Sequence, residues 1–169
     1  QALMRFHQTG GNCFLLGGYL NTNYCDFKSR GELPGLFGGL LGFGMDFRAL
    51  DAESKETIRK TVAVYKDLRE FLNLDYYPIF PQSRAETDWV GWQFLDPGTQ
   101  TGYFVAFRPE PSRYGTAQVR LQGLETGAMY RLKEVMSGEA VSVTGAELAK
   151  TFEVVLAPGT AQVWEFSAQ

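Results

Sequence analysis

The sequence has few of the side chains that bind metals or form disulfides. Its 169 residues contain one histidine and two cysteines. Cys13 and Cys25 lack the paired spacing of a zinc site, and His7 has no partner residues in a ligand pattern. We therefore expect no metal site and no cofactor, and two free thiols of the kind common in reducing compartments.

Runs of basic residues and long hydrophobic segments are also missing. The formal net charge is -3, and no cluster of lysine and arginine stands out, so a general nucleic-acid-binding protein is not expected. We find no secretory signal and no apolar run long enough to cross a bilayer, so we expect no membrane association and a cytoplasmic location. The sequence begins with Gln1 rather than Met, as a piece of a longer protein would.

Two common catalytic motifs are absent. No serine lies in a Gly-x-Ser-x-Gly turn, so the sequence does not support an α/β-hydrolase triad. The run Gly42-Phe43-Gly44 lacks the third glycine and the following helix start of a dinucleotide-binding fingerprint. The sequence therefore supports neither serine hydrolase chemistry nor dinucleotide binding.

Aromatic residues, by contrast, make up 14% of the chain. Most of them are expected in the core, but an exposed ring can also pack against the apolar face of a sugar. Trp89 and Trp92 are three residues apart, so in a regular strand they point to opposite faces, and one could be in the core and the other at the surface. For Trp164 we favour the core.

The stretch Asp51–Leu74 predicts a long amphipathic helix. Asp51 is suited to cap its N-terminus, Lys60 falls on the polar face, and Asn73 is a reasonable stop. The apolar positions form one stripe that needs a partner surface, with Tyr65 largely buried. These positions are Ile58, Val62, Tyr65, Leu68, Phe71 and Leu72.

The chain before this helix has the rhythm of an α/β barrel or of a parallel sheet. Two short apolar runs, Cys13–Leu16 and Leu40–Met45, look like strands buried on both faces, and helical stretches separate them. The stripe of the long helix is expected to pack on these two strands. The pattern of residues 1–74 by itself fits either an α/β barrel or a parallel sheet.

After the helix the pattern changes to the period of two that is typical of strands. Turn signals recur at roughly ten-residue spacing, which favours a small antiparallel β-sandwich over residues 75–169. The whole chain is then an α+β protein in two parts. The expected strands are Tyr76–Phe80, Trp89–Leu95, Gly102–Arg108, Gln118–Leu121, Met129–Val135, Ala140–Val143, Phe152–Leu156 and Gln162–Phe166.

Glycosidase chemistry needs two carboxylates roughly 5 to 10 Å apart. We look for them among the carboxylates of residues 1–74. Asp26, Glu32 and Asp46 lie near the ends of predicted elements. Asp46 directly follows a strand-like run, where the catalytic residues of barrels are found. The simpler explanation, which we favour, is that Asp46 caps a turn or pairs with Arg48. We assign no catalytic residue.

Asparagines follow the other strand-like run. Asn21 and Asn23 could bond sugar hydroxyls, and they could equally be ordinary loop residues. Together with Asp46 they are the candidate substrate-binding residues of this chain.

Several short motifs of the chain have to be considered in combination, because each of them is too short to be informative alone. They are Arg30, Gly38-Gly39, the run Gly42–Asp46, Tyr65-Lys66-Asp67-Leu68-Arg69 followed by Tyr76-Tyr77-Pro78, the strand Gly102–Arg108, and the turn Gly145-Ala146-Glu147-Leu148.

In this combination the chain resembles the end of the catalytic barrel and the following domain of the α-galactosidases of glycoside hydrolase family 36. The resemblance implies that residues 1–74 are the C-terminal portion of a (β/α)8 barrel of the TIM type and that residues 75–169 are the C-terminal β-sandwich that follows it. It also places both catalytic aspartates upstream of Gln1. It implies a C-terminal fragment of a hydrolase of α-galactosides, inactive by itself. The alternative is a non-catalytic carbohydrate-binding or interaction module. Unpaired strand edges of a partial barrel would favour association with another chain, including a second copy.

Overall fold

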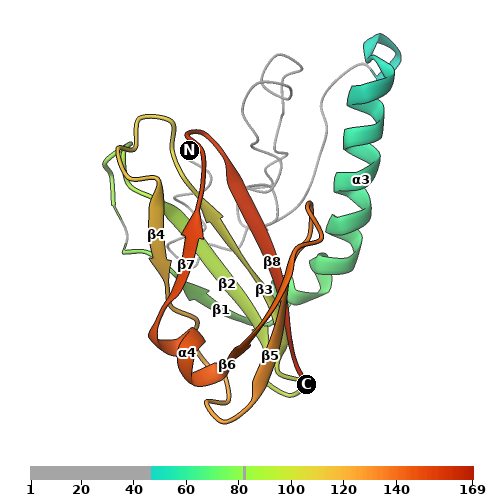
Figure 1. Ribbon diagram of the computed structural model, residues 1–169. Coiled ribbons are helices and arrows are strands. Elements are labelled where there is room, and N and C mark those ends of the chain that lie inside the picture. The colour runs from blue at the N-terminus through green and yellow to red at the C-terminus, as the bar shows by residue number, and fades with distance from the viewer. Residues whose placement is uncertain (1–46, 82) are drawn as a thin grey trace.

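The computed structural model describes residues 47–81 and 83–169. The predicted strands Cys13–Leu16 and Leu40–Met45 lie outside the described residues, as does the predicted barrel end apart from its last helix. The elements run in the order η3 (Phe47–Ala49), α3 (Ala52–Leu68), η4 (Arg69–Asn73), β1 (Asp75–Pro78), β2 (Val90–Asp96), β3 (Thr101–Phe107), β4 (Thr116–Val119), β5 (Met129–Glu134), β6 (Ala140–Thr144), α4 (Gly145–Lys150), β7 (Phe152–Val155) and β8 (Ala161–Ala168) (Figure 1).

The strands form two antiparallel sheets. The larger has six strands in the order β1-β2-β3-β8-β5-β6, and the smaller consists of β4 and β7. In the large sheet β8 lies between β3 and β5, where it joins the first strands of the domain to the later hairpin. The antiparallel sandwich predicted from the sequence is therefore confirmed, with all eight strands close to their expected positions.

One helix of the sandwich was not expected. The segment Gly145–Lys150, predicted as a turn, is the short helix α4. Thr144 Oγ1 accepts a hydrogen bond from Glu147 N at 3.2 Å, and Glu147 Oε2 accepts one from Thr144 N at 3.1 Å. This reciprocal pair is a capping box, which satisfies the free N–H groups of a helix start. Its sequence signature is a threonine followed three residues later by glutamate, here Thr144 and Glu147.

The inner core fills the space between the two sheets. Its rings pack closely: the centroids of Phe152 and Trp164 lie 5.4 Å apart, and Phe104 stacks on Trp164 at 6.4 Å. Leu148 of α4 is fully buried in this core. The buried members are Trp89, Leu95, Phe104, Ala106, Val119, Leu121, Tyr130, Leu132, Leu148, Val154, Leu156, Trp164 and Phe166.

The outer core covers the opposite face of the large sheet. Leu68 at the end of α3 belongs to it, and Phe71 of η4 packs edge-on against Tyr103 with 5.9 Å between ring centroids. Its buried members are Leu68, Val90, Trp92, Phe94, Tyr103, Val105, Phe107 and Val163.

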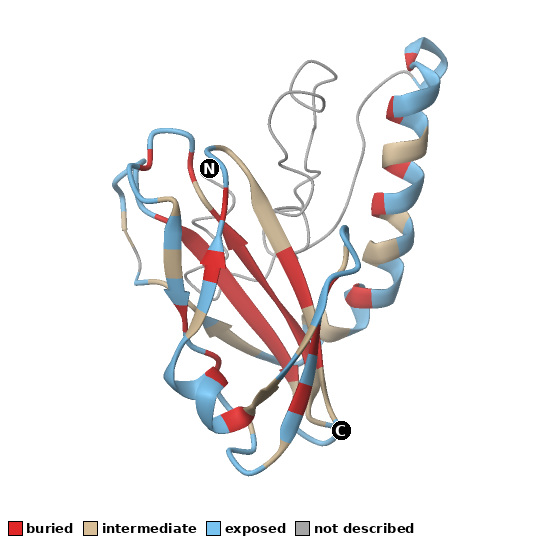
Figure 2. Ribbon diagram, in the orientation of Figure 1, coloured by how far each residue is buried: buried red, intermediate tan, exposed pale blue. Residues whose placement is uncertain are grey.

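Because both faces of the sheet are covered, β2 and β3 are buried along almost their whole length (Figure 2). The sequence left open that one of two tryptophans is exposed, and in the structure neither is. Trp89 and Trp92 do point to opposite faces, but Trp89 enters the inner core and Trp92 the outer core. Trp164 is buried as predicted.

Helix α3 begins as the sequence predicts. Asp51 Oδ1 accepts a hydrogen bond from Ser54 N at 2.7 Å, and the helical stretch continues through η4 to Asn73. The buried stripe, however, runs through Ser54, Ile58, Thr61 and Leu68.

Two predicted positions on the helix need correction. Val62 and Tyr65 are half-buried rather than core residues. The reason is that the small polar side chains Ser54 and Thr61 occupy the buried positions, and the Thr61 hydroxyl donates to the Thr57 carbonyl at 2.9 Å. The buried face of the helix is therefore rotated slightly from the face that hydrophobicity alone indicates.

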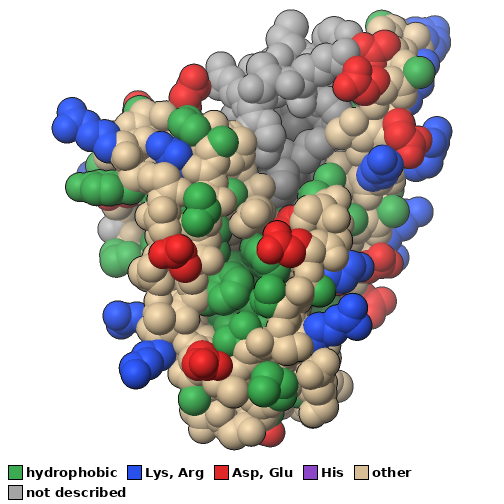
Figure 3. All heavy atoms as spheres, in the orientation of Figure 1, with side chains coloured by type: hydrophobic (Ala, Val, Ile, Leu, Met, Phe, Trp, Pro, Cys, Tyr) green, Lys and Arg blue, Asp and Glu red, His purple; other side chains and the backbone are tan. Residues whose placement is uncertain are grey.

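The sandwich is not closed on every side. Figure 3 shows hydrophobic side chains between the smaller sheet and β6, where none of the described strands joins the two sheets. Val141 of β6 and Phe152 of β7 are half-buried and pack against the inner core.

We expect Leu68→Ala to lower the free energy of unfolding by about 2 to 4 kcal/mol, because this side chain fills the outer core. The matched control Lys60→Ala, on the exposed side of α3, should change it by less than about 0.5 kcal/mol. Urea unfolding followed by tryptophan fluorescence measures both. Equal small effects would show that the helix does not stabilise the sandwich.

A shortened chain that starts at Asp75 should still fold, because every buried residue of the inner core lies after that point. It should melt at a lower temperature than a chain that starts at Asp51, since it lacks Leu68 and Phe71 and exposes the outer core. Calorimetry of the two fragments compares them. An aggregated or non-cooperative shorter fragment would contradict the independence of the sandwich.

Candidate functional site

The candidate substrate-binding residues Asn21, Asn23 and Asp46 lie outside the described residues. Their role therefore stays a prediction. Within residues 47–81 and 83–169 there is no group of three or more metal-ligating side chains. In the same ranges no helix combines the length and apolar character needed to cross a membrane.

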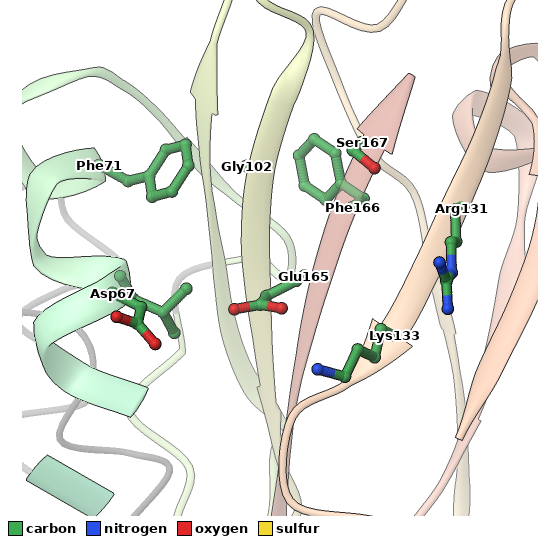
Figure 4. Close-up of a pocket in the computed structure, with 9 residues that line it drawn as sticks. Asp67, Phe71, Gly102, Arg131, Lys133, Glu165, Phe166 and Ser167 are labelled. Carbon is green, nitrogen blue, oxygen red and sulfur yellow. The ribbon is translucent and has the colours of Figure 1, made fainter. Parts of the chain in front are cut away.

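A cavity of about 400 Å³ lies between the helix and the large sheet. We call it the helix–sheet cavity. Its lining comes from three places that are distant in the sequence, namely the end of α3 with η4, the start of β3, and the neighbouring strands β5 and β8. The lining residues are Asp67, Leu68, Phe71, Gly102, Arg131, Lys133, Glu165, Phe166 and Ser167 (Figure 4).

The pairing of the strands positions the charged groups of this cavity. Lys133 of β5 lies directly opposite Glu165 of β8, and Arg131 lies opposite Ser167. Alternate residues of a strand share one face, so both basic side chains and Glu165 stand on the side of the sheet that faces the helix. In Figure 4 Glu165 points toward the helix end that carries Asp67, and Lys133 extends toward Glu165.

Burial controls the ionisation of Glu165. Its pKa is raised, chiefly because the surrounding protein removes water from the carboxylate. Lys133 opposes this shift by attraction, and Asp67 adds to it by repulsion. The pKa of Glu165 therefore depends both on the loss of water around the carboxylate and on the charges of Lys133 and Asp67.

Asp67 and Glu165 form a carboxylate pair that the sequence analysis did not find. They are 98 positions apart, one on the last turn of a helix and the other in the final strand. No local motif marks either residue, so only the folding of the helix onto the sheet reveals the pair.

The surroundings of the pair favour a structural role. Glu165 has Lys133 directly across the strand pairing, an arrangement that stabilises sheets. The apolar part of the cavity comes from Leu68 and Phe166, which belong to the two cores. The helix–sheet cavity is best described as a charged seam that aligns α3 on the sandwich.

The fold is similar to that of α-galactosidases of family 36. The enzyme AgaB from Geobacillus stearothermophilus matches 90% of this chain, with a TM-score of 0.72 and 20% sequence identity. The α-galactosidase from Lactobacillus brevis matches the same share, with a TM-score of 0.71 and 18% identity. AgaA from Geobacillus stearothermophilus, in its A355E D548N form with raffinose, matches 81%, with a TM-score of 0.68 and 20% identity.

These matches cover 22%, 22% and 19% of the three enzymes, so the chain spans about a fifth of their length. The resemblance expected from the sequence motifs is thus confirmed at the level of the fold. No family model and no curated protein matches the sequence.

The raised pKa of Glu165 predicts a pH-dependent effect of Glu165→Gln. The native state binds this proton more tightly than the unfolded chain, whose glutamates titrate near about 4.3, so the wild type loses stability as the pH rises through the raised native pKa. The variant should therefore gain melting temperature relative to the wild type between pH 4 and pH 7. Thermal melts at both pH values measure this gain.

The exposed Glu139 provides the matched control. Glu139→Gln should keep the same difference in melting temperature from the wild type at pH 4 and pH 7. A Glu165→Gln variant that loses stability toward pH 7 would mean that attraction to Lys133 outweighs the effect of burial.

Proposed function

We propose that this chain is the C-terminal part of an α-galactosidase-like glycoside hydrolase of family 36. The observation that carries the proposal is the fold similarity over 81% to 90% of the chain, which corresponds to about a fifth of each enzyme. The sequence motifs from Arg30 to Tyr77 support it independently, since they resemble the same region of that family. In this proposal residues 1–74 complete the barrel and residues 75–169 form the accessory sandwich.

The described contacts suggest what the sandwich contributes. Leu68 and Phe71, which precede the proposed boundary, pack on the large sheet, and Asp67 faces the charged groups of the helix–sheet cavity. The sandwich would thus hold the last barrel helix in place from outside. This role needs no catalytic group in the sandwich, which is consistent with a structural interpretation of Asp67 and Glu165.

The substrates proposed for the whole protein are α-galactosides. Structures of the Geobacillus enzyme AgaA contain raffinose or stachyose. Asn21, Asn23 and Asp46 are proposed to contact the sugar, while the two catalytic aspartates would belong to a segment that precedes Gln1. We also propose a cytoplasmic location and chemistry that requires no cofactor.

The second candidate is a carbohydrate-binding module without catalytic activity. It is favoured by one observation, the exposed ring of Tyr114 beside a cavity on the sandwich. The two candidates differ in the coding sequence upstream of Gln1. An open reading frame of several hundred codons would support the enzyme, and a start codon directly preceded by an in-frame stop would support the module.

The purified 169-residue chain should not hydrolyse nitrophenyl α-galactoside, because both catalytic aspartates are proposed to be missing. The release of nitrophenol is measured against buffer, with AgaB from Geobacillus stearothermophilus as the positive control. Turnover by the chain that disappears in Asp46→Asn or in Glu165→Gln would contradict the proposal and identify the carboxylate responsible.

A further inference from the structure

A second cavity, of about 460 Å³, opens between two loops of the sandwich. We call it the loop cavity. One side comes from residues that precede β2, and the other from Arg113 and Tyr114, which precede β4. The residues before β2 are Phe80, Pro81, Ser83, Thr87, Asp88 and Trp89. Both loops lie on the left of the sandwich in Figure 1. Its volume is within the range of about 300 to 1,000 Å³ that is usual for small-molecule sites.

The backbone of this cavity is firmly held. Trp89 Nε1 donates to the carbonyl of Tyr114 at 3.1 Å, and Leu156 N donates to the carbonyl of Gly115 at 3.0 Å. Arg108 bonds the Ser112 carbonyl at 2.9 Å from the same loop. Three separate parts of the inner sandwich thus fix the short loop that carries Tyr114.

The floor of the cavity is equally well packed. The rings of Phe80 and Trp89 meet edge to face with 6.1 Å between centroids. Phe80 also lies against Gly91, where an added Cβ would come within 2.9 Å of its ring. Only a glycine at this strand position allows the ring to approach so closely.

Tyr114 itself is not buried by any of these contacts. Its side chain is 76% exposed, the highest value among the large hydrophobic residues that the structure describes. The backbone that carries this exposed ring is already held in place. Little further conformational entropy is therefore lost when a ligand packs on the ring. Tyr114 therefore has the properties of a binding platform rather than of a residue left over from the core.

The polar side chains around the ring determine the ligand chemistry. Asp88 supplies a carboxylate acceptor, Arg113 a guanidinium donor and Thr87 a hydroxyl, and all three are exposed beside the cavity. Thr87 Oγ1 donates to Asp88 Oδ1 at 3.2 Å, which restrains the carboxylate. Adjacent acceptor and donor groups next to a ring face complement a pyranose, which has one apolar C–H face and neighbouring hydroxyls that both donate and accept.

Other ligand classes fit less well. An anion would be repelled by Asp88, and a cation would be repelled by Arg113. An extended apolar peptide would remove water from Asp88 and Arg113 without offering them polar groups, which is costly. A neutral polyhydroxylated ligand uses the ring, the acid and the base together.

We propose that the loop cavity is a carbohydrate-binding site of the sandwich, in which a pyranose ring stacks on Tyr114 and its hydroxyls bond Asp88 and Arg113. The inference deepens the second candidate function given above, because it rests on the same ring and cavity, and it does not depend on the proposed hydrolase activity. The sandwich would then hold part of a saccharide on its own surface, whichever enzyme it belongs to.

The test is a titration of the ¹⁵N-labelled 169-residue chain with methyl α-galactoside, raffinose and cellobiose, each up to 50 mM. The indole N–H of Trp89 and the amide of Gly115 flank Tyr114 and report the binding. A dissociation constant of about 1 to 10 mM is expected for at least one sugar, as for a small exposed site.

Variants distinguish the stacking from nonspecific effects. Tyr114→Ala should weaken binding at least about tenfold, and Tyr114→Phe should retain it because the ring face remains. Asp88→Asn should weaken binding while the fold is kept, since this side chain is at the surface. Val155→Ala, at another exposed hydrophobic residue, is the matched control and should bind like the wild type.

The outcomes that would overturn the proposal are equally defined. These are the absence of shifts at Trp89 and Gly115 with all three sugars, or equal affinities of the wild type and Tyr114→Ala. Shifts at these positions with a tyrosine- and proline-containing peptide but with none of the sugars would also overturn it, and would identify the loop cavity as a protein contact. Loss of hydrolase activity in the parent protein would leave this result unchanged.

Discussion

The burial of β2 and β3 on both faces is the constraint on which the rest of this structure depends. Trp92 and Tyr103 lie on one side of these strands and Phe104 and Ala106 on the other, all with essentially no exposed surface. A sheet with two apolar faces needs two coverings. The smaller sheet and α4 provide one, and the end of α3 with η4 contributes to the other.

Buried polar groups complete the scaffold. Gln93 is fully buried in β2, and its amide both donates to the Gln122 carbonyl at 2.8 Å and accepts from Gln122 N at 2.9 Å. The buried carboxylate of Glu134 accepts from the backbone N–H of Ser137 at 2.6 Å and of Met136 at 3.0 Å. Because buried polar groups are costly unless bonded, these pairs fix the path of the loops relative to the strands.

The two cavities follow from this arrangement. The helix–sheet cavity lies where the end of α3 meets the strands that carry Arg131, Lys133 and Glu165. The loop cavity lies where two loops are anchored by Trp89 and Arg108 at the end of the sandwich. The first joins the helix to the sandwich, and the second presents an aromatic ring to solvent. A rigid scaffold thus separates a structural seam from a surface suited to binding.

The sequence by itself determined the positions of the eight strands and the capped start of the long helix. Alternation, turn residues and the Asp51 cap are local signals, and each depends only on neighbours in the chain. Local reasoning was less successful where a covering from elsewhere decides burial. It left open a surface position for one of Trp89 and Trp92, and it expected Val62 and Tyr65 to be core residues.

Only the tertiary structure decided which sites exist among the described residues. Asp67 and Glu165 line one cavity, and Trp89 and Tyr114 line the other, because the chain brings together segments that are distant in sequence. Pairing β8 between β3 and β5 sets Glu165 opposite Lys133, and no pattern within either strand encodes that choice. Strand periodicity specifies which face a side chain takes, whereas the neighbours on that face are specified by the packing of the whole domain.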